Sequence, residues 1–162
     1  MLSEKSEHTI MRRKEKEITE KSEIEAVIQK SIVCRIGLSD DNIPYIVPLC
    51  FGCQNNTIYV HGSLKGRKIN ILQKNPNVCF EFDINTEIVK GENVCEWGMK
   101  YKSVIGFGKA IFLKEPGDMR KALKIIMNQY SDRPSQFLEK ATNGTSVIKI
   151  EIESMTGKQS GF

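Results

Sequence analysis

YVHGSLKGRKINIL, residues 59–72, changes its hydrophobic pattern in the middle. The first residues alternate as in a β-strand and the last follow helical spacing, so a strand should end at Gly62-Ser63 and a helix should follow. A helix N-terminus presents unpaired N–H groups and a partial positive charge. The Ser63 hydroxyl and the cations Arg67 and Lys68 would lie beside it. This strand-to-helix junction therefore has the chemistry of a phosphate site.

The junction matches neither of two common phosphate-binding motifs, GxxxxGK(S/T) and GxGxxG, so a P-loop and a Rossmann nucleotide site are both excluded. The alternative is that Arg67 and Lys68 are ordinary solvent-exposed cations. Taken alone, the residues of the junction favour that simpler interpretation.

The composition is that of a globular domain. The 162 residues suffice for one domain, with 40% of them hydrophobic and 27% charged. The net charge of +4 is too small to indicate a nucleic-acid binder. No apolar run approaches the roughly 18 residues of a membrane helix, and residues 1–10 lack the apolar core of a secretory signal. We therefore expect a cytoplasmic protein that neither spans a membrane nor binds nucleic acid.

The five cysteines do not form a recognisable site. An odd number without framework spacing argues against a disulfide scaffold. Cys50 and Cys53 form a CxxC motif, but no second CxxC or His pair completes a zinc site, and no helix follows as in thioredoxin-like motifs. We expect buried or turn thiols and no bound metal.

Upstream of the junction, the pattern predicts one helix and three strands. Residues 1–10 are polar and are expected to be a flexible extension. Ser22 is the expected N-cap of the helix, with Glu25 completing a capping box. Pro48 cannot donate a sheet hydrogen bond, so its strand should lie at an edge, at a bulge or beside a site. The helix covers residues 19–30, and the strands, expected to form an antiparallel meander, cover residues 33–39, 43–52 and 57–62.

Downstream, a long bent strand is expected, with Gly106 and Gly108 permitting the bend. Helices are predicted at residues 65–74 and 116–130, strands at 75–84, 99–113 and 146–154, and a polar loop at 85–96. The result is a mainly β domain, residues 11–162, with six antiparallel strands and three peripheral helices, which suggests a small barrel.

A second informative stretch is YKSVIGFGKA, residues 101–110. Lys102 and Ser103 follow one another on an otherwise apolar and Gly-rich strand, so they must point to opposite faces. A solvated lysine and a filler serine are the simpler interpretation of this stretch alone.

The motifs together resemble one family. MRRKEKEIT, IPYIVPLCFG, YVHGSLKGRK, NPNVCFEF, YKSVIGFGKA and IKIEIESMTGK occur in the order and spacing of the pyridoxamine 5′-phosphate oxidase-like FMN-binding split-barrel superfamily, nitroimidazole-resistance (Nim-type) branch. The resemblance covers nearly all of residues 11–161. It implies a six-stranded antiparallel split β-barrel of the FMN-binding type, and a homodimer with FMN at the subunit interface.

Site residues follow from the resemblance. Gly62 and Ser63 would end the strand, and Arg67 and Lys68 would hold the FMN phosphate. His61 would lie near the reactive face of the flavin and donate a proton or stabilise charge. The alternative is a histidine that only packs and hydrogen-bonds.

The resemblance implies further contacts elsewhere in the chain. Lys102 and Ser103 match a basic residue and a glutamine of the oxidases, so the glutamine contact is replaced. Trp97 would cover the flavin across the subunit interface, or else anchor its own loop. The residues expected beside the isoalloxazine ring are Val47, Pro48 and Leu49.

The leading functional hypothesis is an FMN-dependent oxidoreductase that reduces a small-molecule acceptor such as a nitro compound or a quinone. Oxidation of vitamin B6 is not expected, because the chain ends in TGKQSGF and lacks the Arg/His/Trp-rich substrate segment of the true oxidases. A second hypothesis is a non-catalytic module that stores FMN, or binds heme with His61 as an axial ligand.

Overall fold

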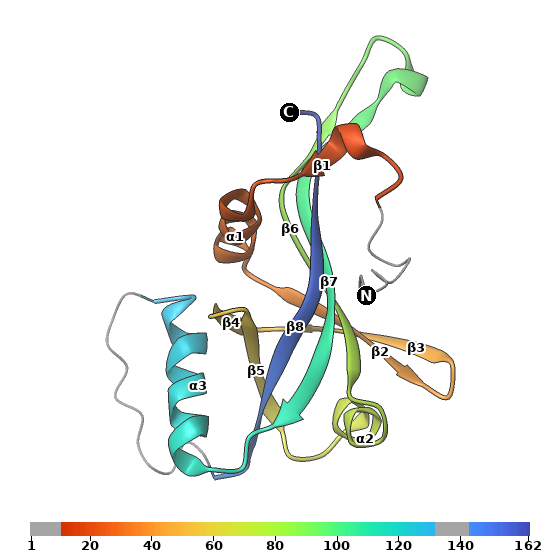
Figure 1. Ribbon diagram of the computed structural model, residues 1–162. Coiled ribbons are helices and arrows are strands. Elements are labelled where there is room, and N and C mark those ends of the chain that lie inside the picture. Colours follow the sequence, from red (N-terminus) through yellow and green to blue (C-terminus); the bar gives the residue numbers. More distant parts are fainter. Residues whose placement is uncertain (1–10, 132–142) are drawn as a thin grey trace, which may run out of the picture.

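The computed structural model describes residues 11–131 and 143–162 (Figure 1). The predicted extension, residues 1–10, lies outside this part of the chain. The helices are α1 (Lys21–Lys30), α2 (Arg67–Lys74) and α3 (Pro116–Asn128), with short 3-10 helices at Lys14–Lys16 and Val94–Glu96. The strands are β1 (Glu17–Ile18), β2 (Cys34–Asp40), β3 (Ile43–Leu49), β4 (Phe51–Gln54), β5 (Thr57–Ser63), β6 (Asn77–Val89), β7 (Gly98–Phe112) and β8 (Thr145–Ser160).

All eight strands belong to one antiparallel sheet. Its order is β3-β2-β6-β7-β8-β5-β4, and β1 pairs with β8 outside this path. β3 and β4 stand at opposite ends of the order, yet only Cys50 separates them in the chain. Because one residue spans less than about 4 Å, the sheet must curl until its two ends come together. It forms a barrel that stays open between β3 and β4.

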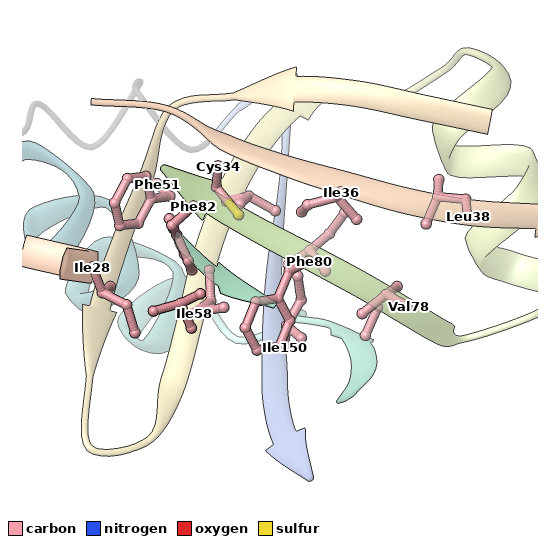
Figure 2. Close-up of a cluster of buried hydrophobic side chains, with 14 of the residues drawn as sticks. Ile28, Cys34, Ile36, Leu38, Phe51, Ile58, Val78, Phe80, Phe82 and Ile150 are labelled. Atoms are coloured by element: carbon pink, nitrogen blue, oxygen red, sulfur yellow. The ribbon is translucent and has the colours of Figure 1, made fainter. Parts of the chain in front are cut away.

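The inner face of the curled sheet carries the hydrophobic core. Side chains from β2, β4, β5, β6 and β8 point toward one another there and meet Ile28 of α1 (Figure 2). The ring of Phe82 lies 4.8 Å from that of Phe51 and 5.9 Å from that of Phe80, measured between centroids. Aromatic pairs at such distances add about 0.5–1.5 kcal/mol beyond their buried area. These contacts join β4 to β6 across the interior, although the two strands are not neighbours in the sheet.

The three helices cover different parts of the barrel. α1 and α2 add apolar side chains to the main core, whereas α3 packs through Leu123 and Ile126 in a separate cluster with Val147 of β8. Figure 1 shows α3 beside β4 and β5, and α2 at the end of the barrel where β5 stops. Among the described residues, no helix is long and apolar enough to cross a membrane.

The predicted architecture is confirmed: a mainly antiparallel β domain with three peripheral helices. β3, the strand that contains Pro48, is an edge strand of the described sheet. β7 is a single long strand, and its pairing with β8 shifts register between Phe107 and Gly108, as the predicted bend requires.

The strand count and the meander differ from the prediction. The sheet has eight strands instead of six, because the apolar run at residues 43–52 divides at Cys50 into β3 and β4 and the two residues of β1 also pair. β2 and β3 form the expected hairpin, but β5 pairs with β4 and β8 and not with β3. The predicted meander is therefore wrong beyond its first hairpin, because the chain passes at Cys50 from β3, at one end of the strand order, to β4, at the other end.

Several predicted boundaries are also wrong. Ser22 is not the N-cap of α1: Glu20 holds that position, without a side-chain cap, and the helix begins at Lys21. Residues 85–96 are not a simple loop, because β6 continues to Val89 past a register shift between Ile84 and Glu87. The tail after residue 154 is ordered against β7 as far as Ser160. In the two strand cases, pairing orders residues whose polar pattern suggested a loop or a tail.

We expect Gly52→Ala to destabilise the fold. A Cβ at Gly52 would lie 2.6 Å from the backbone carbonyl of Ile125, so α3 must move away from β4. Overpacking of this kind costs about 1–3 kcal/mol. Urea unfolding would measure it, with Gly98→Ala as the control, because a Cβ there meets nothing within 4 Å. Equal stability of the two variants would contradict the tight contact between β4 and α3.

Candidate functional site

The predicted junction is present between β5 and α2. β5 ends at Ser63, whose Oγ accepts a hydrogen bond from the Lys65 N–H at 3.3 Å and so shapes the turn. Gly66 is the N-cap of α2 with a φ of 127°, a conformation that side chains disfavour, and this is why the helix begins at Arg67 and not at residue 65. No side chain in the described part of the protein caps α2. The N–H groups of its first turn are thus left for solvent or a ligand.

The two cations of the junction are held in different ways. Lys68 is half-buried, and its Nζ lies over Gly62, where an added Cβ would be only 2.7 Å away. Burial lowers the pKa of the Lys68 ammonium. Arg67 is exposed, and its guanidinium lies 4.7 Å from the ring centroid of Tyr45 on β3. This cation–π contact ties α2 to the edge strand and restricts the Arg67 side chain.

Carboxylates do not compensate this charge. Within residues 11–131 and 143–162, neither Arg67 nor Lys68 forms an ion pair. By contrast, Lys74 at the other end of α2 pairs with Asp40 at 3.5 Å, and Arg35 pairs with two acids on β6. Two unpaired cations beside an uncapped helix N-terminus attract an anion, because the helix dipole adds to their field.

His61 points to a different face of the sheet from Gly62. It pairs in register with Val147, which packs in the α3 cluster, whereas Gly62 pairs with the buried Ser146. Burial, and then the charge of Lys68, lower the pKa of His61. Its Nδ1 is buried and has no hydrogen-bond partner in the described part of the chain. The neutral imidazole is therefore favoured at neutral pH, with one nitrogen unsatisfied.

The three residues expected beside a flavin ring lie on β3. Val47 and Leu49 pack against the core, and Pro48 is exposed. Because Val47 and Leu49 turn their side chains to the core, β3 would contact a ligand at the sheet edge mainly through its backbone. β3 is an edge strand among the described residues, so the backbone groups along its outer side have no partner strand there. The Tyr45–Arg67 contact places this edge next to the junction.

Lys102 and Ser103 lie far from the junction within one chain. Ser103 pairs with Lys158 and His61 pairs with Val147, at opposite ends of the 16-residue β8. At the rise of an extended strand this separation is on the order of 35 Å. One chain therefore does not bring the two predicted halves of the site together.

The far end of the sheet has its own aromatic and cationic side chains. The Nζ atoms of Lys100 and Lys102 lie 4.5 and 5.0 Å from the ring centroid of Phe162. Trp97 is exposed and has the Lys90 Nζ 5.2 Å from its ring centroid. Figure 1 shows the β6–β7 hairpin extending beyond the barrel at this end.

Sequence reasoning missed Tyr45 and Phe162. Tyr45 stands two residues before Val47 on the same face of β3, so strand alternation could have placed it in the predicted group. Phe162 lies within the segment expected to be a tail, and no sequence signal connected it with Lys102.

Comparisons with known proteins identify a family for the chain. A family model described as pyridoxamine 5′-phosphate oxidase matches residues 20–159. The crystal structure of a candidate 5-nitroimidazole antibiotic resistance protein from Bacteroides thetaiotaomicron is 34% identical, with a TM-score of 0.80 over 88% of this chain and 86% of that chain. No curated protein matches the chain.

Two more distant structures share the fold. The flavocytochrome Anf3 from Azotobacter vinelandii has a TM-score of 0.83 at 17% identity, covering 97% of this chain and 75% of its own. An FAD and heme binding protein from Mycobacterium smegmatis has a TM-score of 0.78 at 18% identity, covering 91% and 74%. Given the family model and the 34% identical relative, the chain belongs to the pyridoxamine 5′-phosphate oxidase-like family.

Proposed function

We propose that the protein binds FMN, with its phosphate at the junction of β5 and α2, and reduces a small-molecule acceptor such as a nitro compound or a quinone. The observation that carries this proposal is that Arg67 and Lys68, beside the uncapped start of α2, form no ion pair with any described residue. A phosphate monoester carries up to two negative charges, which these two cations match.

The relatives support a flavin over other phosphate-bearing ligands. The similar structures include a flavocytochrome and an FAD and heme binding protein, and the relative at 34% identity is linked to 5-nitroimidazole resistance. We favour FMN over FAD because the junction offers one cationic centre for one terminal phosphate. A bound flavin would supply the redox chemistry, accepting two electrons from a donor and passing them to the acceptor.

The residues of this chain would hold and orient the cofactor. The fork of Arg67, restricted by Tyr45, suits bidentate contact with two phosphate oxygens. Lys68 would add a second positive charge. The Ser63 hydroxyl would donate a hydrogen bond to the phosphate while its oxygen accepts one from the Lys65 N–H. The backbone of Val47, Pro48 and Leu49, at the sheet edge, would face the polar edge of the ring.

A second copy of the chain would complete the site. Lys102, Ser103 and Trp97 lie at the far end of the sheet, so we propose that this end of the sheet reaches a flavin held by the partner of a homodimer. Because Lys102 and Ser103 point to opposite faces of β7, only one of these two side chains would contact that flavin. The outer face of β3-β2-β6-β7 supports this proposal. Ile46, Gly37, Cys79 and Phe107 are in register across these four strands and form an apolar row, of which Ile46 is 67% exposed.

The next row on this outer face combines apolar and charged side chains. Pro48, Arg35, Glu81 and Ile105 are in register, and Ile105 is 46% exposed. Arg35 pairs with Glu81 at 3.1 Å and also with Asp83. A face with a partly exposed apolar row and charges of both signs suits the self-complementary contact of a two-fold dimer. Ser103 lies two residues from Ile105 and so shares this face.

Arg67→Ala should weaken FMN binding by about 1.5–3 kcal/mol, the usual value of a hydrogen bond to a charged group. Riboflavin lacks the phosphate, so its affinity should change little. Fluorescence titration of both flavins would measure the effect, with Lys74→Ala as a control at the opposite end of α2. Equal losses for FMN and riboflavin would contradict the phosphate assignment.

The protein should sediment as a dimer of about twice the 18.4 kDa chain mass, with or without flavin. Ile46→Glu should dissociate it, because a carboxylate would be buried in the apolar row. Ile32→Glu is the control, since Ile32 is 79% exposed and lies outside the four strands.

The experiment distinguishes two claims: that the protein is a dimer with a shared flavin site, and that the interface lies on the outer face of β3-β2-β6-β7. A wild-type monomer that binds FMN tightly would rule out the shared site. A dimer that is unchanged in Ile46→Glu would instead place the interface elsewhere.

His61→Ala should leave FMN affinity within a few-fold and lower turnover by about 10²–10⁴-fold, the usual contribution of a positioned acid or base. Because the pKa of His61 is lowered, its protonated form is lost below the ordinary value near 6.5 as pH rises. The rate of acceptor reduction should therefore fall with rising pH in the acid range, and this dependence should disappear in the variant. Full activity of His61→Ala at every pH would mean a structural histidine.

A further inference from the structure

A cavity lies at the end of β5 opposite the junction. It has a volume of about 390 Å³, is partly open to solvent, and is lined by residues of α1, the turn between β4 and β5, and β8. This volume falls within the roughly 300–1,000 Å³ of small-molecule sites. β5 has seven residues between the two ends, so about 20 Å separate the cavity from the junction. The cavity is therefore distinct from the proposed phosphate site.

Carboxamide side chains dominate the rim of the cavity. Asn56 is structural, because its Nδ2 donates to the Ile152 carbonyl oxygen at 3.0 Å. The side chains of Gln29, Gln54 and Asn55 line the cavity and form no hydrogen bond with any other described residue. Each carboxamide offers two donor hydrogens and one acceptor oxygen. The rim can thus recognise a ligand that has donors and acceptors side by side.

The cavity is close to electrically neutral. Its cation and its anion, Lys21 and Glu25, pair with each other at 3.7 Å. Burial, and then the charge of Glu25, raise the pKa of the Cys53 thiol to about 11, so this thiol stays protonated at neutral pH. In the described part of the chain, no three His, Cys, Asp or Glu side chains are grouped as metal ligands. The lining therefore favours a neutral ligand over an anion or a metal ion.

The floor of the cavity is apolar. Ile28 is buried, and Ile152 and Met155 are half-buried beneath the carboxamide rim. A thioether makes favourable contacts with aromatic rings, in the range of about 0.3–1.5 kcal/mol. An apolar floor below a rim of donors and acceptors suits a flat ring that presents its face to the floor and its edge to the rim.

We propose that this cavity binds a neutral, planar heterocycle with donors and acceptors on its edge, and specifically the purine base of a nucleoside. Asn and Gln side chains form paired hydrogen bonds with the edge of adenine, one donated and one accepted. Gln54 on β4 and Gln29 on α1 approach the cavity from two elements and serve as the recognising side chains.

The probe is adenosine, titrated into the full-length protein and followed by the backbone amide signals in two-dimensional NMR. Saturable shifts confined to α1 and to the turn between β4 and β5 are expected. Ribose should give none, and AMP should bind no more tightly than adenosine. Tighter binding of AMP would overturn the proposal in favour of a phosphate site, and the absence of saturable shifts at millimolar adenosine would overturn it outright.

Substitutions identify the contacts. Gln29→Leu and Gln54→Leu should each raise the Kd for adenosine about fivefold, the effect of one lost neutral hydrogen bond. Gln73→Leu is the matched control, an exposed glutamine on α2. Equal effects of all three substitutions would contradict the assignment. Arg67→Ala should leave adenosine binding unchanged, so the outcome is independent of whether the junction holds FMN.

Discussion

The single-residue link at Cys50 is the constraint on which the rest of the structure depends. It joins β3 and β4, the two ends of the strand order, so the sheet can exist only as a curled surface with an inside and an outside. Curling brings Phe51 of β4 onto Phe82 of β6 and closes the core. It also carries the edge strand β3 round to α2, where Tyr45 meets Arg67. The candidate site thus arises where the two ends of the sheet approach each other.

Charge distribution then distinguishes this region from the remaining surface. Four of the eight ion pairs of the described residues join two exposed side chains and contribute little to stability. Arg67 and Lys68 differ, because neither pairs with a carboxylate of the described residues. Arg67 lies against an aromatic ring, and Lys68 is half-buried over a glycine. Half-burial of the Lys68 ammonium without a carboxylate costs stability. An anionic ligand would remove that cost, which is the physical reason for assigning a binding role to the pair.

Local sequence patterns predict the individual elements of the site, but they do not predict which elements lie next to one another in the fold. The strand-to-helix junction was predictable because Gly62, Ser63 and the two cations all fall within residues 62–68. The division at Cys50 was not, since the apolar pattern continues through it and only long-range pairing separates β3 from β4. Likewise, the contact between Tyr45 and Arg67 depends on the curl, which no local pattern encodes. The polar part of β6 was mistaken for a loop because a projecting two-stranded hairpin has no core side to require apolar alternation.

The central claim is that the uncompensated cations at the start of α2 exist to hold FMN. Its most direct test is to purify the protein with its cofactor, record the visible absorbance spectrum, and identify by chromatography what is released on denaturation. We predict the two-banded spectrum of an oxidised flavin and one FMN per chain, taken up again when FMN is added to the stripped protein. A Soret band from heme, the release of FAD alone, or a stripped protein that does not take up FMN would contradict the account.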